Sequence, residues 1–266
     1  MDLQVFDVEH GACALLTTDN ATRIMIDAGS TEEWRPGDYL ASIKVSVLEQ
    51  LIITNYDEDH VSGIGNLFDR VLVLNLMRNV SVSTSMIREL KSDDGMGAGI
   101  DRLISAADTS FVRPGPATPP PPFKDVTIQV FSNTPADFDD ENNLSLVTHL
   151  TCNGVGVMFP GDIEKAGWLK LLENPGLRAA LANTQIFVAS HHGRESGCCD
   201  EVFSFCKPRF VVISDKGHMH DTQQTVGYYS PRAEGGLFRG YMRRVLTTRN
   251  DNGIGFSFGP TGWSVY

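Results

Sequence analysis

The sequence lacks both a long apolar run and a targeting signal. None of its 266 residues lies in a stretch approaching the roughly 18–20 uninterrupted apolar residues of a membrane span. The first residues contain neither the basic segment nor the apolar segment of a secretory signal. We therefore expect a cytoplasmic protein that does not associate with a membrane.

The sequence also lacks the Cys-x-x-Cys spacing of thiolate metal sites and redox pairs. Its five cysteines are Cys13, Cys152, Cys198, Cys199 and Cys206. We expect reduced thiols that mostly pack in the core. A reactive pair at the adjacent Cys198 and Cys199 is the less favoured alternative.

Positive charge is scarce in this chain. Lysine and arginine number 22 against 33 aspartates and glutamates, so the formal net charge is −11. This balance argues against sequence-independent binding of long duplex DNA through a basic surface. The acidity has two readings, which are an ordinary acidic surface and a pocket of carboxylates that holds cations.

The arrangement of apolar runs predicts a mixed α/β fold. We expect one domain over residues 1–266, with a proline-rich, extended connector at residues 113–123 between two halves. Each half places strands before helices, which suggests a four-layer αββα sandwich of two mixed sheets flanked by helices.

The predicted elements follow from apolar periodicity and from turn residues. Strands are predicted at residues 1–6, 12–17, 23–26, 51–54, 70–76, 126–131, 144–151, 155–159, 186–190 and 210–214, with a closing hairpin of residues 246–253 and 254–258. Helices are predicted at residues 37–49, 86–91, 164–172 and 175–181.

A polar segment follows the apolar run at residues 51–54. Asn55, Asp57 and Asp59 stand at every second position, and His60 comes next. This spacing directs the side chains to one spot, and mixed carboxylate and imidazole groups suit Zn²⁺ or Mn²⁺ in a hydrolytic centre. A solvated turn or a helix N-cap explains the two aspartates equally well.

Three more ligand-type segments follow apolar strands. They contain Asp162, the His-His-Gly run at residues 191–193 and the Gly-His-Met-His run at 217–220. Strand ends of α/β proteins gather where active sites are usually built. The two histidines outside these segments are His10, in a polar turn after a strand, and His149, which we expect to be packed within a strand.

Motifs in a fixed order between residues 6 and 256 carry a family resemblance. They lie at residues 6–13 (Phe-Asp-Val-Glu-His-Gly-Ala-Cys), 26–29 (Ile-Asp-Ala-Gly), 54–63, 142–147 (Asn-Asn-Leu-Ser-Leu-Val), 161–162 (Gly-Asp), 191–193 (His-His-Gly) and 217–218 (Gly-His). Together they resemble the metallo-β-lactamase-fold hydrolases, specifically the branch related to the competence protein ComEC/Rec2.

The resemblance implies a centre for one or two divalent ions, zinc or manganese. Its ligands would be Asp59, His60 and His218 for one ion, Asp57 and His191 for another, and Asp162 as the bridge. Asn55 occupies the position of the family's first histidine. An amide oxygen is a weak, neutral ligand that suits Mn²⁺ or Mg²⁺ better than Zn²⁺, so this site is weak, altered in metal preference or empty.

Other residues of these segments are expected to face the substrate. His191 lies nearer the strand end and is the expected ligand, which leaves His192 either to support a ligand or to contact the substrate. Asn143, Ser145 and Lys216 are further candidates for substrate contacts, against readings as turn or surface residues. Asp59 is expected to orient the nucleophile as well, and His220 is either a proton donor or an ordinary loop histidine.

The resemblance implies a metal-dependent hydrolase that uses a metal-activated hydroxide, most simply a phosphodiesterase or nuclease. The phosphodiester rests on the resemblance alone. The lack of a basic face favours a small or single-stranded nucleic acid as the substrate. The alternative is a catalytically weak binding or regulatory subunit with a protein partner, which is motivated by Asn55.

Overall fold

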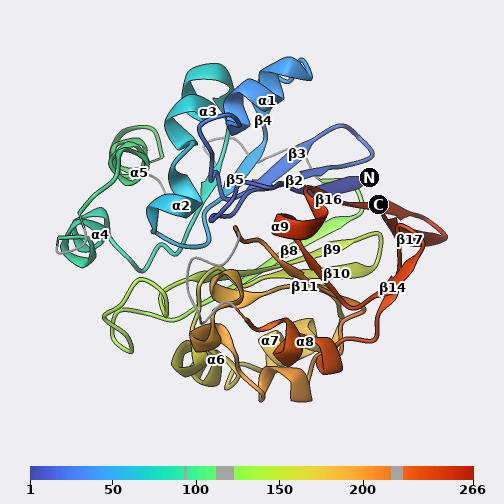
Figure 1. Cartoon of the computed structure of the whole chain (residues 1–266). Helices are drawn as coiled ribbons and strands as arrows, with labels where there is room; N and C mark the ends of the chain where they lie inside the picture. The colour runs from blue at the N-terminus through green and yellow to red at the C-terminus, as the bar shows by residue number, and fades with distance from the viewer. Residues whose placement is uncertain (93–94, 112–122, 217–223) are drawn as a thin grey trace.

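The computed structural model describes residues 1–92, 95–111, 123–216 and 224–266 (Figure 1). The proline-rich connector predicted at 113–123 lies outside these residues except for Phe123. The helices are α1 Pro36–Ser42, α2 Glu58–Val61, α3 Ile64–Arg70, α4 Thr84–Leu90, α5 Ala98–Thr109, α6 Lys165–Leu171, α7 Pro175–Ala182, α8 Val226–Tyr229 and α9 Thr248–Asp251. None of the helices described is long and apolar enough to cross a membrane.

The strands form two large mixed sheets and two small ones. Their bounds are β1 Asp2–Val5, β2 Ala14–Thr17, β3 Arg23–Ile26, β4 Val47–Leu48, β5 Gln50–Ile52, β6 Leu72–Val73, β7 Leu76–Met77, β8 Val126–Ser132, β9 Leu146–Cys152, β10 Val155–Phe159, β11 Thr184–Val188, β12 Phe210–Ile213, β13 Gly236–Phe238, β14 Tyr241–Arg243, β15 Val245–Thr247, β16 Ile254–Gly259 and β17 Gly262–Val265. β4 pairs with β6, and β13 pairs with β14.

Both large sheets combine antiparallel and parallel pairs. The first sheet has the strand order β17-β16-β1-β2-β3-β5-β7, and its parallel part runs from β3 to β7. The second sheet has the order β15-β12-β11-β10-β9-β8, and its parallel part runs from β15 to β10. Each sheet therefore presents the carboxyl ends of neighbouring parallel strands at one edge.

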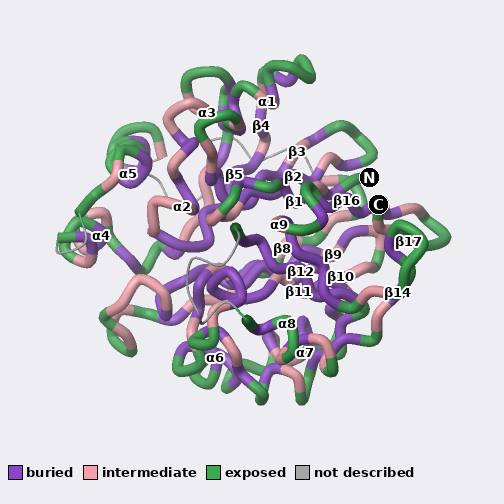
Figure 2. The backbone as a smooth tube through the Cα atoms, in the orientation of Figure 1, coloured by how far each residue is buried: buried purple, intermediate pink, exposed green. Residues whose placement is uncertain are grey.

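Three apolar clusters pack four layers together: helices, the first sheet, the second sheet and further helices. Leu3, Ile24 and Ile52 of the first sheet pack against Leu150 and Val157 of the second, so the sheets face each other. A second cluster joins the outer face of the first sheet to α1, α3 and α5, and a third joins the second sheet to α6 and α7. In Figure 2, buried residues concentrate in the central strands of the two facing sheets, and exposed residues lie mainly at the periphery, including the outer helices. This arrangement confirms the predicted αββα sandwich.

The helix predicted at residues 37–49 is wrong beyond its first turns. α1 ends at Ser42, and Lys44 adopts a left-handed backbone with φ of 61°. That conformation cannot continue a right-handed helix. The backbone N–H of Val45 donates to the carbonyl of Leu40, and the chain then enters β4. β-branched residues favour this extended conformation.

The predicted closing hairpin is also wrong, because its two strands belong to different sheets. β15 pairs with β12 in the second sheet, whereas β16 pairs with β1 in the first. α9 and the left-handed Asn252, with φ of 57°, carry the chain from one sheet to the other. β16 instead forms an antiparallel hairpin with β17, the strand that follows it.

Candidate metal centre

Polar residues from both sheets meet where the parallel strands end. Asp27 follows β3, and the segment of residues 55–60 follows β5 and leads into α2. Asp162 follows β10, and His191 and His192 follow β11 in a short 3-10 helix, Ser190–Gly193. The carboxyl ends of parallel strands thus bring together residues that lie far apart in the chain.

Close backbone packing holds α2 against the loop after β3. The N–H of Ala28 donates to the carbonyl of His60 at 2.8 Å. A Cβ atom on Gly29 would lie 2.4 Å from the carbonyl oxygen of Asp59, so only glycine fits there. The Asp-Ala-Gly motif therefore fixes the position of two adjacent ligand-type residues.

Four side chains converge at this edge, and we call them the His/Asp cluster: Asp59, His60, Asp162 and His192. Nε2 of His60 lies 3.0 Å from Oδ1 of Asp162. Nε2 of His192 lies 3.2 Å from Nε2 of His60 and 3.2 Å from Oδ2 of Asp59. His60, Asp162 and His192 are buried, and Asp59 is partly exposed. Nε2 of His192 therefore lies near the carboxylates of both Asp59 and Asp162 and near Nε2 of His60.

The outer nitrogens of both histidines have acceptors. Nδ1 of His60 lies 3.0 Å from Oδ2 of Asp27, and Nδ1 of His192 lies 2.9 Å from the carbonyl oxygen of Ser214. Asp27 in turn accepts hydrogen bonds from the backbone N–H and the hydroxyl of Thr54. Metal-binding histidines are commonly held by such contacts, which leave the other nitrogen for the ion.

Within the cluster, the imidazoles and the carboxylates stabilise each other's charged forms. Burial opposes the imidazolium, but the Asp162 and Asp27 carboxylates outweigh it and raise the pKa of His60 well above its usual value. Burial also disfavours the carboxylate of Asp162, yet His60 and His192 lower its pKa. The same balance between burial and His192 lowers the pKa of Asp59 to about 2. Divalent-ion binding would therefore displace protons from the histidines.

The backbone is strained around the cluster. Asp27, His191 and His192 have φ values of 57°, 52° and 51°, in the left-handed region that side chains other than glycine rarely adopt. The N–H of His191 donates to the carbonyl of Gly161 at 3.1 Å, which ties the strained turn to the segment carrying Asp162. Strain of this kind persists where the surrounding structure holds a functional geometry.

The donor set fits a divalent metal ion. The facing nitrogens and the carboxylate oxygen of His60, His192 and Asp162 all lie within 4.8 Å of one another. A cavity of about 30 Å³ beside them is lined by Ala12 and Phe159 among others. Two imidazoles with carboxylates are ligands that Zn²⁺ and Mn²⁺ accept.

His10 lies beside the cluster. Its Nε2 is 3.7 Å from Oδ2 of Asp59, and its ring centroid is 4.7 Å from that of His192. These three residues form a second group with ligand spacing. The sequence signals for His10 were its polar turn after a strand and its place in the motif at residues 6–13, and neither connected it to residues 59 and 192.

Two of the predicted ligands after β5 turn to protein partners. Nδ2 of Asn55 donates to Oγ of Ser145 at 3.1 Å and to Asn142, while its Oδ1 accepts the N–H of Asp57. The carboxylate of Asp57 forms an ion pair with the ammonium of Lys91. Neither side chain belongs to the His/Asp cluster.

His191 is likewise engaged outside the cluster. Its Nδ1 lies 3.0 Å from Oγ of Ser196, and its Nε2 lies 3.2 Å from a guanidinium nitrogen of Arg194. The nearest carboxylate oxygen of Asp162 is 3.8 Å from that Nε2. The structure therefore places His192 in the cluster and His191 at its margin, whereas the sequence analysis expected His191 as the ligand.

The other residues expected to contact the substrate have different surroundings in the structure. Asn143 is buried, accepts the N–H of Gly167 and donates to Asp140. Ser145 is buried and accepts the backbone N–H of Asp162 at 3.1 Å, so it supports the cluster. Lys216 is exposed and pairs with Glu9. His218 and His220 lie outside the described residues.

Sequence reasoning missed two residues that contact the ligand segments. Asp27 stands in the Asp-Ala-Gly motif at the end of a predicted strand, and that position was the signal for its presence at this edge. Lys91 carried no such signal, because it comes from the end of α4, 34 positions from Asp57.

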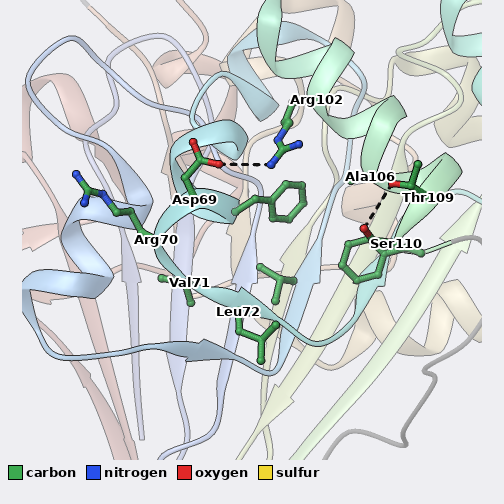
Figure 3. A pocket seen from close by; sticks show the side chains of 11 residues that line it. Asp69, Arg70, Val71, Leu72, Arg102, Ala106, Thr109 and Ser110 are labelled. Atoms are coloured by element: carbon green, nitrogen blue, oxygen red, sulfur yellow. Dashed lines mark hydrogen bonds and ion pairs between the residues drawn. The ribbon is translucent and has the colours of Figure 1, made fainter.

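A separate hollow of about 490 Å³ lies beside α3 and α5 (Figure 3). Phe68 and Phe111 line it, and Asp69 forms an ion pair with Arg102 at 3.4 Å across its rim. None of its lining residues belongs to the His/Asp cluster, and none is a site residue predicted from the sequence.

Comparison with curated proteins reveals a distant relative. The chain is 23% identical over 259 residues to ComE operon protein 3 of Bacillus subtilis. The match covers 90% of this chain and 31% of that protein, so the chain spans about a third of the length of the relative. No protein-family model matches the sequence.

Several solved structures are similar to the chain. The metallo-β-lactamase fold protein YhfI from Bacillus subtilis has a TM-score of 0.49 and 11% identity, covering 94% of this chain and 98% of that one. For a diphosphatase of the PhnP family the TM-score is 0.46, with 8% identity and coverages of 97% and 98%. For human tRNase Z, short form, the corresponding values are 0.41, 12%, 84% and 97%.

The strand order and the helical layers of the chain itself describe its architecture. The chain folds as the four-layer α/β sandwich of two mixed sheets that the sequence predicts.

Proposed function

We propose that the chain is a metal-dependent hydrolase whose divalent ion is held by Asp59, His60, Asp162 and His192. The observation that carries this proposal is the buried His60–Asp162–His192 group, in which both histidines direct Nε2 toward the carboxylates. When bound, a divalent ion supplies a Lewis acid and lowers the pKa of coordinated water. Zinc and manganese both suit the donor set.

The protein residues perform the orienting steps of this reaction. Asp27 and the Ser214 carbonyl hold the two imidazoles in position. Asp59 is partly exposed at the edge of the cluster, where it can orient a nucleophile. The guanidinium of Arg194 lies near His10 and His191, within reach of an anionic group that enters the site.

We further propose a phosphodiester as the substrate. This choice rests on the motif resemblance to the ComEC/Rec2-related branch, with Arg194 beside the cluster as a suitable partner for a phosphate. With a net charge of −11, the chain suits a small or single-stranded nucleic acid better than a long duplex.

The test compares two adjacent histidines. Purified wild type, His192→Ala and His191→Ala are loaded with Mn²⁺ or Zn²⁺, dialysed, and assayed for metal content and for hydrolysis of an aryl phosphodiester. Because His192 faces the cluster, its removal should weaken metal binding by at least about tenfold and lower the rate in parallel. His191→Ala serves as the matched control and should retain its metal. Wild-type protein that binds neither ion would contradict the proposal.

The alternative is a binding or regulatory subunit. It is favoured by Asn55, whose amide is hydrogen-bonded to Ser145 and to the backbone N–H of Asp57. It predicts metal binding that depends on His192, without hydrolysis of any phosphodiester tested. The same experiment therefore separates a catalytic centre from a structural metal site.

A further inference from the structure

Lys91 forms a buried charge cluster next to the segment that carries Asp59 and His60. It follows the last residue of α4 and is 4% exposed. Its ammonium donates to the carboxylate of Asp57 and to Oε1 of Glu141 at 2.7 Å. A buried ammonium shared by two carboxylates is a compensated arrangement that is costly to break by removing one partner.

The ion pair between Lys91 and Asp57 involves a side chain that the family resemblance implies as a metal ligand. Asp57 and His191 are the two residues implied for the second ion, and each faces a cationic side chain. Lys91 pairs with Asp57, while Arg194 lies 3.2 Å from Nε2 of His191. The amide of Asn55, beside them in the motif, is bonded to Ser145 and Asn142.

A divalent ion bound by Asp57 would have to share its carboxylate with the Lys91 ammonium. Two cations compete for one carboxylate because like charges repel strongly in a poorly solvated site. Lys91 has the advantage of being covalently part of the protein and of holding a second carboxylate, that of Glu141. The His/Asp cluster, in contrast, contains no lysine or arginine.

We infer that Lys91 replaces the second metal ion, so that this chain binds a single divalent ion at the His/Asp cluster and carries a fixed ammonium at Asp57. The inference rests on the proposed function, since it needs the cluster to bind metal. Asp57 is then a partner of Lys91 rather than a ligand, and the positive charge at that position does not depend on the metal supply.

Metal stoichiometry tests the inference without an activity assay. The full chain is stripped with a chelator and titrated with Mn²⁺ by calorimetry, and electron paramagnetic resonance reports any pair of coupled Mn²⁺ ions. Wild type should bind one ion and show no coupled signal. Lys91→Met removes the ammonium and leaves Asp57 and Glu141 available, so this variant should bind two ions.

The matched control is Lys170→Met. Lys170 also lies between two carboxylates, those of Asp137 and Glu173, but on the surface. Its substitution should leave one ion per chain. Two ions in wild type, or a single ion in folded Lys91→Met, would overturn the inference and leave the proposed function intact. No binding by wild type would overturn both.

A second variant covers the case in which Lys91→Met does not fold. Asp57→Asn retains the size of the side chain and removes its charge. Disturbing a ligand contact is expected to lower the metal affinity about tenfold. If Asp57 is not a ligand, this variant should bind one ion, and its affinity should change by less than that. A larger loss of affinity, or a loss of one ion from two, would overturn the inference.

Discussion

His149 shows how a single buried residue can set the acid sensitivity of the molecule. It lies within β9 and is 1% exposed, and neither ring nitrogen has a hydrogen-bond partner among the described residues. Burial lowers its pKa from 6.5 to about 4. The folded state therefore holds the neutral ring, while the unfolded chain takes up a proton below pH 6.5.

The sign of the pH effect follows from this lowered pKa. The stability associated with neutral His149 is present above pH 6.5 and is lost progressively as the pH falls toward 4. Between about pH 7.5 and pH 4.5, we expect the free energy of unfolding of wild type to fall by about 2–3 kcal/mol more than that of His149→Leu. Urea unfolding of the metal-free proteins at both pH values measures the difference. Equal losses in the two proteins would show that His149 does not titrate in this range.

At the scale of elements, Glu58 connects α2 to α5. α5 begins after Gly97, which supplies no side-chain cap. The Glu58 carboxylate accepts the N–H groups of Gly99 at 2.8 Å and Ile100 at 3.1 Å. It thereby satisfies two of the free N–H groups at the helix start and places a negative charge at the positive end of the helix.

Removal of this cap should destabilise the chain without emptying the metal centre. We expect Glu58→Ala to lower the free energy of unfolding by about 1–2 kcal/mol, as for loss of a helix N-cap. Glu58→Gln keeps an acceptor oxygen and should lose less. Urea unfolding measures both variants, and calorimetry should show unchanged metal stoichiometry because the carboxylate points to α5. Equal stability of Glu58→Ala and wild type would contradict the capping role.

At the scale of the whole molecule, the His/Asp cluster joins the two sheets. Asp59 and His60 follow a strand of the first sheet, and Asp162 and His192 follow strands of the second. The backbone makes the same connection, since the N–H of Leu146 donates to the carbonyl of Thr54 at 2.7 Å. A ligand held by both sheets stabilises the folded state by binding to it alone.

Metal addition should therefore raise the melting temperature of the chelator-treated protein. At a free metal concentration about 100 times the Kd, the gain is about 2.7 kcal/mol, equivalent to about 5–10 °C for a chain of this size. Differential scanning calorimetry measures the shift. Asp162→Ala should abolish it, and a full shift in that variant would show that the ion binds elsewhere.

Local sequence features predicted much of the secondary structure. The strands expected at residues 23–26 and 155–159 match β3 and β10, because each is a short apolar run bounded by turn residues. The predictions at 37–49 and at the closing hairpin failed where tertiary pairing decided the outcome. Strand membership in a sheet depends on distant partners that the local pattern does not contain.

The sequence by itself determined the mixed α/β class and the strand ends that carry Asp59, His60 and Asp162, since periodicity and turn chemistry are local properties. Only the tertiary structure decided that His192 rather than His191 faces the cluster, because both adjacent histidines adopt left-handed backbone. It alone placed Lys91 at Asp57, since this contact joins segments 34 positions apart. Charge pairing across such distances depends on the folded path of the chain, which no single motif specifies.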